Sequence, residues 1–157
     1  MGKRIDDLVA RLDKGARKTD EFFARLTHEQ ACQVIYAEPH VWTARDVLAH
    51  FLSAEAALLK VAQDIAAGGP GAPPGFDYDA FNAQEQARLA GRPLAALRSA
   101  LTEARAATLA WLSTLDDQDL DRVGRHPALG EINLETVVNA IYGHQLMHAR
   151  DLARRLA

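Results

Sequence analysis

The sequence predicts an all-α protein, a four-helix bundle, on three observations. Alanine and leucine dominate the 157 residues while aromatic residues make up only 6%, a composition that favours helix over sheet. Long stretches carry apolar residues at three- and four-residue steps, which is typical of one buried helix face. Turn-forming clusters separate these stretches, and no alternating pattern of useful length predicts a strand. We expect residues 1–157 to form one domain.

The first two helices are expected at residues 3–26 and 43–67. Thr43, followed three residues later by Asp46, resembles a capping box and therefore predicts the start of the second helix. The second helix ends where the sequence reads GGPGAPPG, at residues 68–75, because glycine and proline there exclude further helix.

A shorter helix is expected at residues 77–90, between the second and third long helices. Pro93 suits the first position of the third long helix, which runs to about residue 115, because proline has no N–H to lose there. Asn133 is expected to cap the last helix, which continues to the C-terminus. Irregular links are expected at residues 27–41, 68–75 and 116–131.

The composition and charge of the chain argue against some classes of binding partner. The net charge is −3 and no long run of lysine or arginine occurs, so neither nucleic acid nor an anionic membrane is expected as a partner. No segment approaches the ~20 apolar residues of a membrane span, and the N-terminal stretch has no apolar signal core. Cys32 is the only cysteine, so an internal disulfide is ruled out. Its position in the sequence does not indicate thiol catalysis. We expect a cytoplasmic protein that acts on a small molecule.

Two histidines stand one turn apart on the last helix. At ~100° per residue, His144 and His148 lie about 40° apart and share a face with Val137 and Ile141. Each neutral imidazole has a donor and an acceptor to satisfy, and a divalent cation bound by both rings would satisfy them. The alternative is one buried, hydrogen-bonded histidine with the other at the rim of the core.

His50 supplies a third candidate ligand. It lies at the edge of the apolar arc of the second helix, from which a side chain can reach a neighbouring helix of a bundle. His50, His144 and His148 would leave one coordination position open for water or substrate, as in a reactive rather than a structural site. The other histidines are expected in surface loops, with a pocket mouth as an alternative for the last of them: His28, His40 and His126.

Two carboxylates and three aromatic residues are candidates for the surroundings of this site. Glu55 falls within the apolar arc of the second helix, and Asp151 lies one turn beyond His148. Either could orient an imidazole or act as a base, and both also suit ordinary salt bridges. The aromatic candidates for pocket walls, chosen by their positions near the ligands, are Trp42, Phe81 and Tyr142.

Familiar catalytic motifs are absent from the sequence. The last helix reads HQLMH at residues 144–148, so the glutamate that follows the first histidine in H-E-x-x-H is replaced by glutamine. Glutamine cannot serve as a general base, which argues against a zincin-type protease. No G-x-S-x-G motif and no phosphate-binding loop occurs either.

Taken together, these segments resemble the DinB-like superfamily of bacterial four-helix bundles, which includes YfiT-like proteins and the N-terminal domain of mycothiol-dependent maleylpyruvate isomerase. The resemblance rests on WTARDVLAH at residues 42–50 and on the His144-x-x-x-His148 pair. The linkers FDYDAFN at 76–82 and GRHPALG at 124–130 add to it, and it spans nearly the whole chain.

This resemblance implies an up-down-down-up bundle in which His50, His144 and His148 bind a nickel or zinc ion, and it makes a homodimer plausible. Three functions are compatible with it. The first is a metal-dependent S-transferase that uses a low-molecular-weight thiol, and the second is a metal-dependent hydrolase that uses a metal-bound water. The third is a non-enzymatic, stress-associated bundle that binds a metal or a ligand. The fold alone does not choose among them.

Overall fold

The computed structural model describes residues 2–156. Within them, four long helices form the bundle: α1 Lys3–Ala24, α3 Ala44–Ala66, α5 Leu94–Leu112 and α6 Leu134–Arg155. Three shorter helical segments connect them: α2 His28–Cys32, α4 Tyr78–Leu89 and the 3₁₀ helix η1 Asp117–Asp121. The remaining elements are the strands β1 Val34–Tyr36, β2 Trp42–Thr43, β3 Val123–His126 and β4 Gly130–Asn133.

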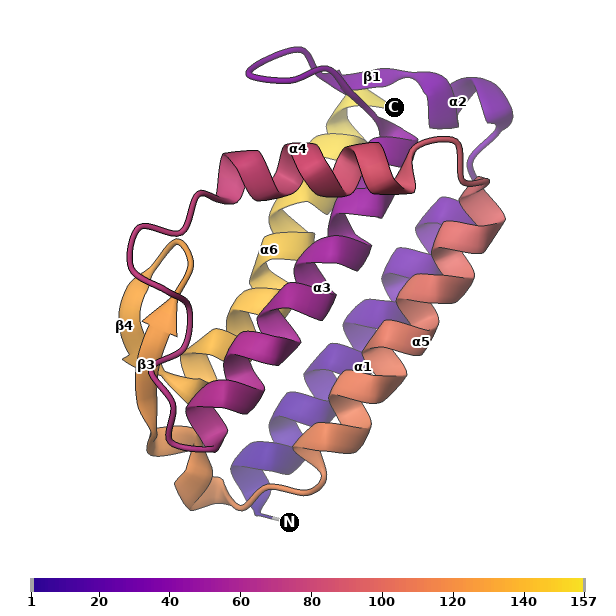
Figure 1. The fold of residues 1–157 in the computed structure, drawn as a ribbon. Helices are drawn as coiled ribbons and strands as arrows, with labels where there is room; N and C mark the ends of the chain where they lie inside the picture. Colours follow the sequence, from indigo (N-terminus) through magenta and orange to yellow (C-terminus); the bar gives the residue numbers. More distant parts are fainter. Residues whose placement is uncertain (1, 157) are drawn as a thin grey trace.

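The order of helix directions is up-down-down-up, as expected (Figure 1). α3 runs back alongside the bundle, α4 crosses near one end, and α5 therefore runs in the same direction as α3. α1 and α3 each pack against both α5 and α6, so α1 and α3 are diagonal to one another. The two helices that carry the candidate ligands, α3 and α6, are direct neighbours.

Both helices that carry histidines begin at the caps expected from the sequence. Thr43 accepts a hydrogen bond from the backbone N–H of Asp46, whose carboxylate in turn accepts from the Thr43 N–H. Asn133 accepts from the backbone N–H of Thr136 at 2.9 Å. These caps satisfy N–H groups that the first turn of a helix leaves without partners, and so they fix the register of α3 and α6.

The core divides into an upper and a lower half along the bundle. One half surrounds Phe23 and Phe51 near α2 and α4, and the other surrounds Leu8 and Leu112 near the N-terminus. Between them lies a buried ion pair, in which Arg105 is 3% exposed and Glu55 1%. No helix within residues 2–156 combines the length and the apolar character needed to cross a membrane.

The links are more ordered than the sequence predicted. β1 pairs with β2 and β3 pairs with β4, each antiparallel, and α2 and η1 also lie in segments expected to be irregular. The helical fold class is confirmed, and the links add two short hairpins that the sequence did not indicate. The strands contain only two to four residues, too few for an alternating pattern to stand out in the sequence.

Candidate metal centre

The structure brings three histidines from two helices into one cluster. His50 projects from α3, while His144 and His148 project from successive turns of α6. Nε2 of His144 lies 2.8 Å from Nε2 of His50 and 3.2 Å from Nε2 of His148. One nitrogen from each ring falls within 4.8 Å of the other two. The cluster is the one expected from helical spacing.

Burial keeps these three rings neutral near pH 7. Loss of solvation is the main cause that lowers the pKa of His50 to about 3 and that of His144 to about 4, and the neighbouring imidazoles lower both further. Burial also lowers the pKa of His148, which Asp151 partly offsets. Neutral imidazoles have the lone pairs that a metal ion requires.

Tyr36 fixes which nitrogen of His148 faces the cluster. The Tyr36 hydroxyl donates to Oδ2 of Asp151 at 2.6 Å, so its oxygen accepts the N–H from Nδ1 of His148 at 2.8 Å. The Nδ1 proton leaves the Nε2 lone pair free for a ligand. Burial and the Asp151 carboxylate raise the pKa of Tyr36, so the hydroxyl keeps its proton.

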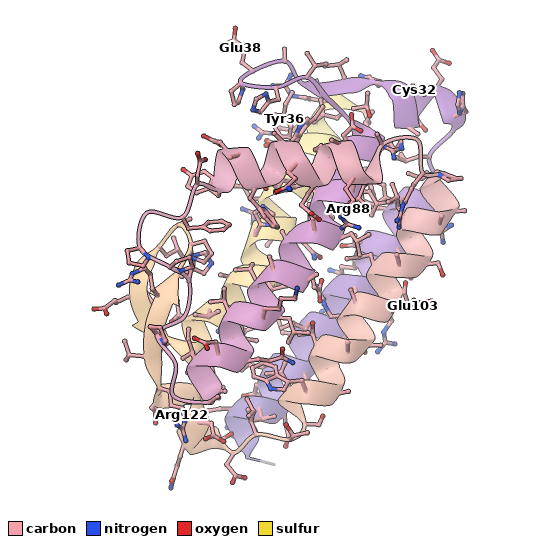
Figure 2. The ribbon with its side chains drawn as sticks, viewed as in Figure 1. Cys32, Tyr36, Glu38, Arg88, Glu103 and Arg122 are labelled. Atoms are coloured by element: carbon pink, nitrogen blue, oxygen red, sulfur yellow. The ribbon has the colours of Figure 1, made fainter. Side chains whose placement is uncertain are left out.

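Tyr36 lies on β1, close to the C-terminal end of α6 (Figure 2). The sequence did not single it out, because its role depends on how β1 folds back against α6. Asp151 was expected near His148, and the structure places it there. The Tyr36 hydroxyl hydrogen-bonds both residues and so connects them. Its carboxylate also pairs with Arg154 at 2.5 Å.

Glu55 does not lie in the cluster. Of the two roles that its position allowed, the salt bridge is confirmed and support of the ligands was wrong. Both of its carboxylate oxygens bind Arg105, at 2.5 and 2.9 Å. Thr108 and Gln145 also donate to them. A carboxylate whose two oxygens are both engaged by an arginine is committed to that ion pair.

Of the three expected pocket aromatics, only Trp42 packs against a ligand. Its ring centroid is 4.8 Å from that of His50, and it borders a cavity of about 290 Å³. Phe81 instead packs on Phe76, with ring centroids 5.6 Å apart. Phe51, which the sequence did not single out as a wall of the site, lies with its ring centroid 6.0–6.3 Å from the rings of His144 and His148.

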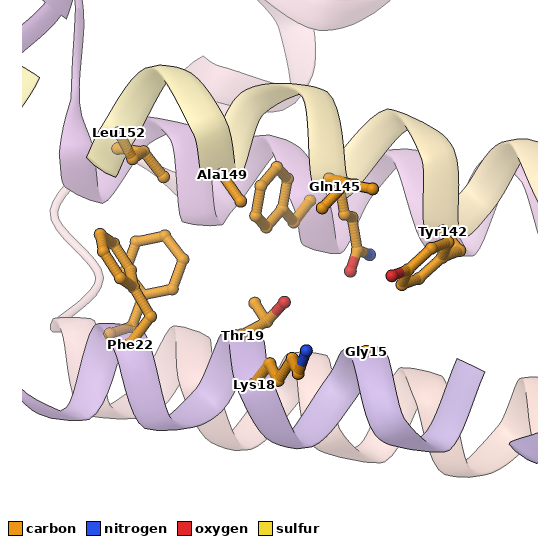
Figure 3. A pocket seen from close by; sticks show the side chains of 11 residues that line it. Gly15, Lys18, Thr19, Phe22, Tyr142, Gln145, Ala149 and Leu152 are labelled. Atoms are coloured by element: carbon orange, nitrogen blue, oxygen red, sulfur yellow. The ribbon is translucent and has the colours of Figure 1, made fainter. Parts of the chain in front are cut away.

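Tyr142 lies on a different face of α6 and lines a second cavity (Figure 3). This cavity has a volume of about 180 Å³ and is lined by residues of α1 and α6. Figure 3 shows Tyr142 at one end of it and Phe22 at the other. Tyr142 packs directly over Gly15 of α1, where an added Cβ would come within 2.6 Å of its ring. Its ring therefore closes the α1–α6 contact rather than walling the histidine cluster.

The remaining histidines divide between surface and interior. His28 and His40 are exposed, as expected, although His28 begins α2 and lies 3.7 Å from Sγ of Cys32. His126 was expected in a surface loop and is instead 8% exposed at the end of β3. The hairpin that buries it was not visible in the sequence.

With this geometry in place, comparison with known proteins identifies the family. The sequence profile of the DinB superfamily matches residues 11–152, so this chain belongs to the DinB superfamily. No curated protein matches the sequence.

Several solved structures share the fold. YfiT from Bacillus subtilis, described as a probable metal-dependent hydrolase with an unusual four-helix bundle topology, matches 99% of this chain and 90% of its own, with a TM-score of 0.76 and 21% identity. The mycothiol-dependent maleylpyruvate isomerase matches with a TM-score of 0.74 and 15% identity, but this chain spans only 63% of that protein. A protein from Escherichia coli UTI89 matches 99% of this chain and 94% of its own, with a TM-score of 0.75 and 14% identity.

The cluster has the chemistry of a divalent metal site. In tetrahedral zinc sites the metal–nitrogen distance is ~2.0–2.1 Å, which requires ligand nitrogens a little over 3 Å apart. The 2.8 and 3.2 Å separations are close to that spacing. Nε2 of His148 carries no proton, so its lone pair faces the cluster. An ion at the centre would accept the Nε2 lone pairs of all three rings at once, which the N–H groups of these rings cannot do. The residues therefore fit the metal that the fold family implies.

Proposed function

We propose that this chain is a divalent-metal enzyme, a hydrolase whose reactive centre is formed by His50, His144 and His148. The observation that carries the proposal is the convergence of three neutral imidazoles from α3 and α6, within 4.8 Å of one another. When bound, a divalent ion supplies Lewis acidity and lowers the pKa of a water or thiol in its open position. We propose nickel or zinc, since imidazole nitrogen suits both.

The protein's own residues prepare this centre in two ways. Tyr36 and Asp151 hold the His148 ring in one tautomer and orientation. Trp42 packs on His50, and Phe51 packs on the two rings of α6. These aromatic walls exclude water from one side, and a drier site strengthens every electrostatic interaction within it.

Three neutral ligands support chemistry on an anionic nucleophile. Imidazoles contribute no negative charge, so the full positive charge of the ion remains available to stabilise an anion. This explains how the site could work even though Glu55 is committed to Arg105 and cannot serve as a base. The fold shared with the probable metal-dependent hydrolase YfiT, over 90% of that chain, favours hydrolysis.

A second candidate is transfer of a low-molecular-weight thiol. It is favoured by the fold shared with the mycothiol-dependent isomerase, and the same centre would lower the pKa of a thiol as it would that of water. A third candidate, a non-enzymatic bundle that sequesters a metal or a ligand, predicts bound metal without turnover.

Elemental analysis of the purified protein tests the centre itself. We expect about one nickel or zinc ion per wild-type chain and a large loss of metal in His148→Ala. The matched control is His28→Ala, because His28 is exposed and distant in sequence from the ligands; it should retain metal. Equal metal content in wild type and His148→Ala would refute the proposed centre.

Activity measurements on the metal-loaded protein then separate the three candidates. Hydrolysis predicts release of p-nitrophenol from p-nitrophenyl acetate that is abolished by chelation and by His148→Ala. Thiol transfer predicts metal-dependent consumption of mycothiol or bacillithiol in the presence of an electrophile such as monobromobimane. A stoichiometric ion with no turnover in either assay would favour sequestration.

A further inference from the structure

The cavity between α1 and α6 is a neighbour of the candidate metal centre but is not part of it. Phe51 lines this cavity, and the same ring has its centroid 6.3 Å from that of His144 and 6.0 Å from that of His148. None of the three ligand histidines lines the cavity. The cavity is therefore a second space in the bundle, which shares only the wall formed by Phe51 with the centre.

This cavity suits one aromatic ring both in size and in lining. An apolar cavity of about 150 Å³ in a protein interior holds a benzene molecule, and the volume here is about 180 Å³. Nearly all of the lining surface is apolar, and the rings of Phe22, Phe51 and Tyr142 contribute to it. Aromatic rings pack favourably against one another, and a ring in this space would restore contacts that its walls lack.

The buried polar group in the wall of the cavity is already occupied. Gln145 is 5% exposed and lines the cavity. Its amide oxygen accepts from Arg105 at 3.2 Å, and its amide nitrogen donates to Glu55 at 3.0 Å. Since a polar group buried without a partner is costly, the part of a ligand that enters this space has to be apolar.

Polar groups that can meet an anion border the same cavity. Lys18 is exposed, whereas Thr19 and Tyr142 are half-buried. Figure 3 shows the ammonium of Lys18 and the hydroxyls of Thr19 and Tyr142 directed into the space between α1 and α6. None of these three groups is engaged by another side chain among residues 2–156. An ammonium and two hydroxyls are donors that suit a carboxylate.

We propose that this cavity binds a small aromatic carboxylate. Its ring lies between Phe22, Phe51 and Tyr142, and its carboxylate is bound by Lys18 at the solvent side. Charge complementarity with Lys18 selects the acid over a neutral compound of the same shape, and the enclosed volume limits the ligand to one ring. This site needs no metal ion, so it is independent of the proposed metal function.

Titration with phenylacetate tests the site, with the amide NMR signal of Gly15 in the full chain as the readout, because Gly15 lines the cavity. Phenylacetamide has the same ring without the charge, and we expect it to bind about fivefold more weakly. Lys18→Ala should weaken phenylacetate by about the same factor and leave phenylacetamide unchanged. Lys14→Ala is the matched control, since Lys14 lies one turn earlier on α1, is exposed and does not line the cavity.

A second variant fills the cavity. Thr19 lies between Phe22 and Tyr142 along it (Figure 3), and Thr19→Leu adds apolar volume there. We expect this variant to bind both compounds at least tenfold more weakly and to melt about 2–4 °C higher, because leucine fills the space and favours the helix. A loss of binding accompanied by a gain in stability does not arise from unfolding.

Four results would overturn the proposal. The first is no saturable binding of phenylacetate to the wild-type protein, and the second is wild-type affinity in Thr19→Leu. The third is binding that chelation of the metal-loaded protein abolishes, which would place the carboxylate at the metal centre instead. The fourth is a change of the Gly15 signal on dilution without any ligand, which would show that a second copy of the chain covers the cavity. Equal affinity before and after chelation supports the separate site.

Discussion

The hydroxyl of Tyr36 lies 2.8 Å from Nδ1 of His148, although 112 residues separate them in the sequence. This hydrogen bond decides which nitrogen of the ring faces His50 and His144. Removing a residue that hydrogen-bonds a metal-binding histidine typically lowers metal affinity by ~10–100-fold. The contact between β1 and α6 is therefore part of the candidate metal centre.

Tyr36→Phe should weaken metal binding by about tenfold or more, because His148 loses the acceptor that holds its Nδ1 proton. Competition with a chromophoric chelator measures the affinity, and circular dichroism checks that the bundle is retained. Tyr78→Phe is the matched control, since Tyr78 is 50% exposed. Unchanged affinity in Tyr36→Phe would show that the hydroxyl does not orient the ligand.

The metal-free protein should lose stability as the pH falls from 7 to 5. The unfolded histidines bind protons below their ordinary pKa of 6.5, whereas folded His50 and His144, with pKa values of about 3 and 4, remain neutral. The unfolded state therefore binds more protons in this range, and the free energy of unfolding falls by roughly 2–4 kcal/mol at pH 5. Urea unfolding of chelator-treated protein at each pH measures it, and His144→Gln should show a shallower dependence. A flat profile between pH 7 and 5 would contradict the burial of these rings.

Glu55→Gln should destabilise the bundle strongly without removing the metal. The substitution leaves Arg105, 3% exposed, without its counter-charge, which typically costs about 3–5 kcal/mol. The partly exposed pair of Arg98 and Asp20 is the control, and Asp20→Asn should cost less than about 1 kcal/mol.

Urea denaturation gives both stabilities, and elemental analysis of the folded fraction gives the metal content. Loss of metal from folded Glu55→Gln would show that Glu55 contributes to metal binding. A stability within about 1 kcal/mol of wild type would mean that the pair is not buried as described.

Two glycines of the bundle should respond in opposite directions to alanine. A Cβ at Gly15 would meet the ring of Tyr142 at 2.6 Å, whereas a Cβ at Gly143 meets nothing within 4 Å. Gly15→Ala should therefore cost about 1–3 kcal/mol through overpacking. Gly143→Ala should gain about 0.5–1 kcal/mol, because alanine favours the helix. Thermal unfolding of the two variants measures both, and a neutral Gly15→Ala would mean that α1 and α6 are able to separate there.

Helical spacing was sufficient to predict the bundle and its three histidines. The period of an α-helix fixes which residues share a face, so His144 and His148 could be paired, and His50 placed at a core edge, without any structure. The caps at Thr43 and Asn133 were equally local, and both are confirmed.

The surroundings of the site depend on contacts that no local pattern encodes. Tyr36 reaches it through a hairpin whose strands have only two and three residues. Glu55 was on the expected stripe of α3, but its partner Arg105 comes from α5, 50 residues away. Helical periodicity identifies the polar residue but not the neighbour that neutralises it, because tertiary packing determines that neighbour.

The order in which the ligands are synthesised has a consequence for how the protein matures. His50 precedes His144 by 94 residues, so a growing chain holds a single imidazole of the set until α6 has been made and docked. Under the proposed function, metal capture is thus tied to the synthesis of α6. A chain that stops before α6 would have no competent centre, and the ion would selectively stabilise only molecules that contain this helix.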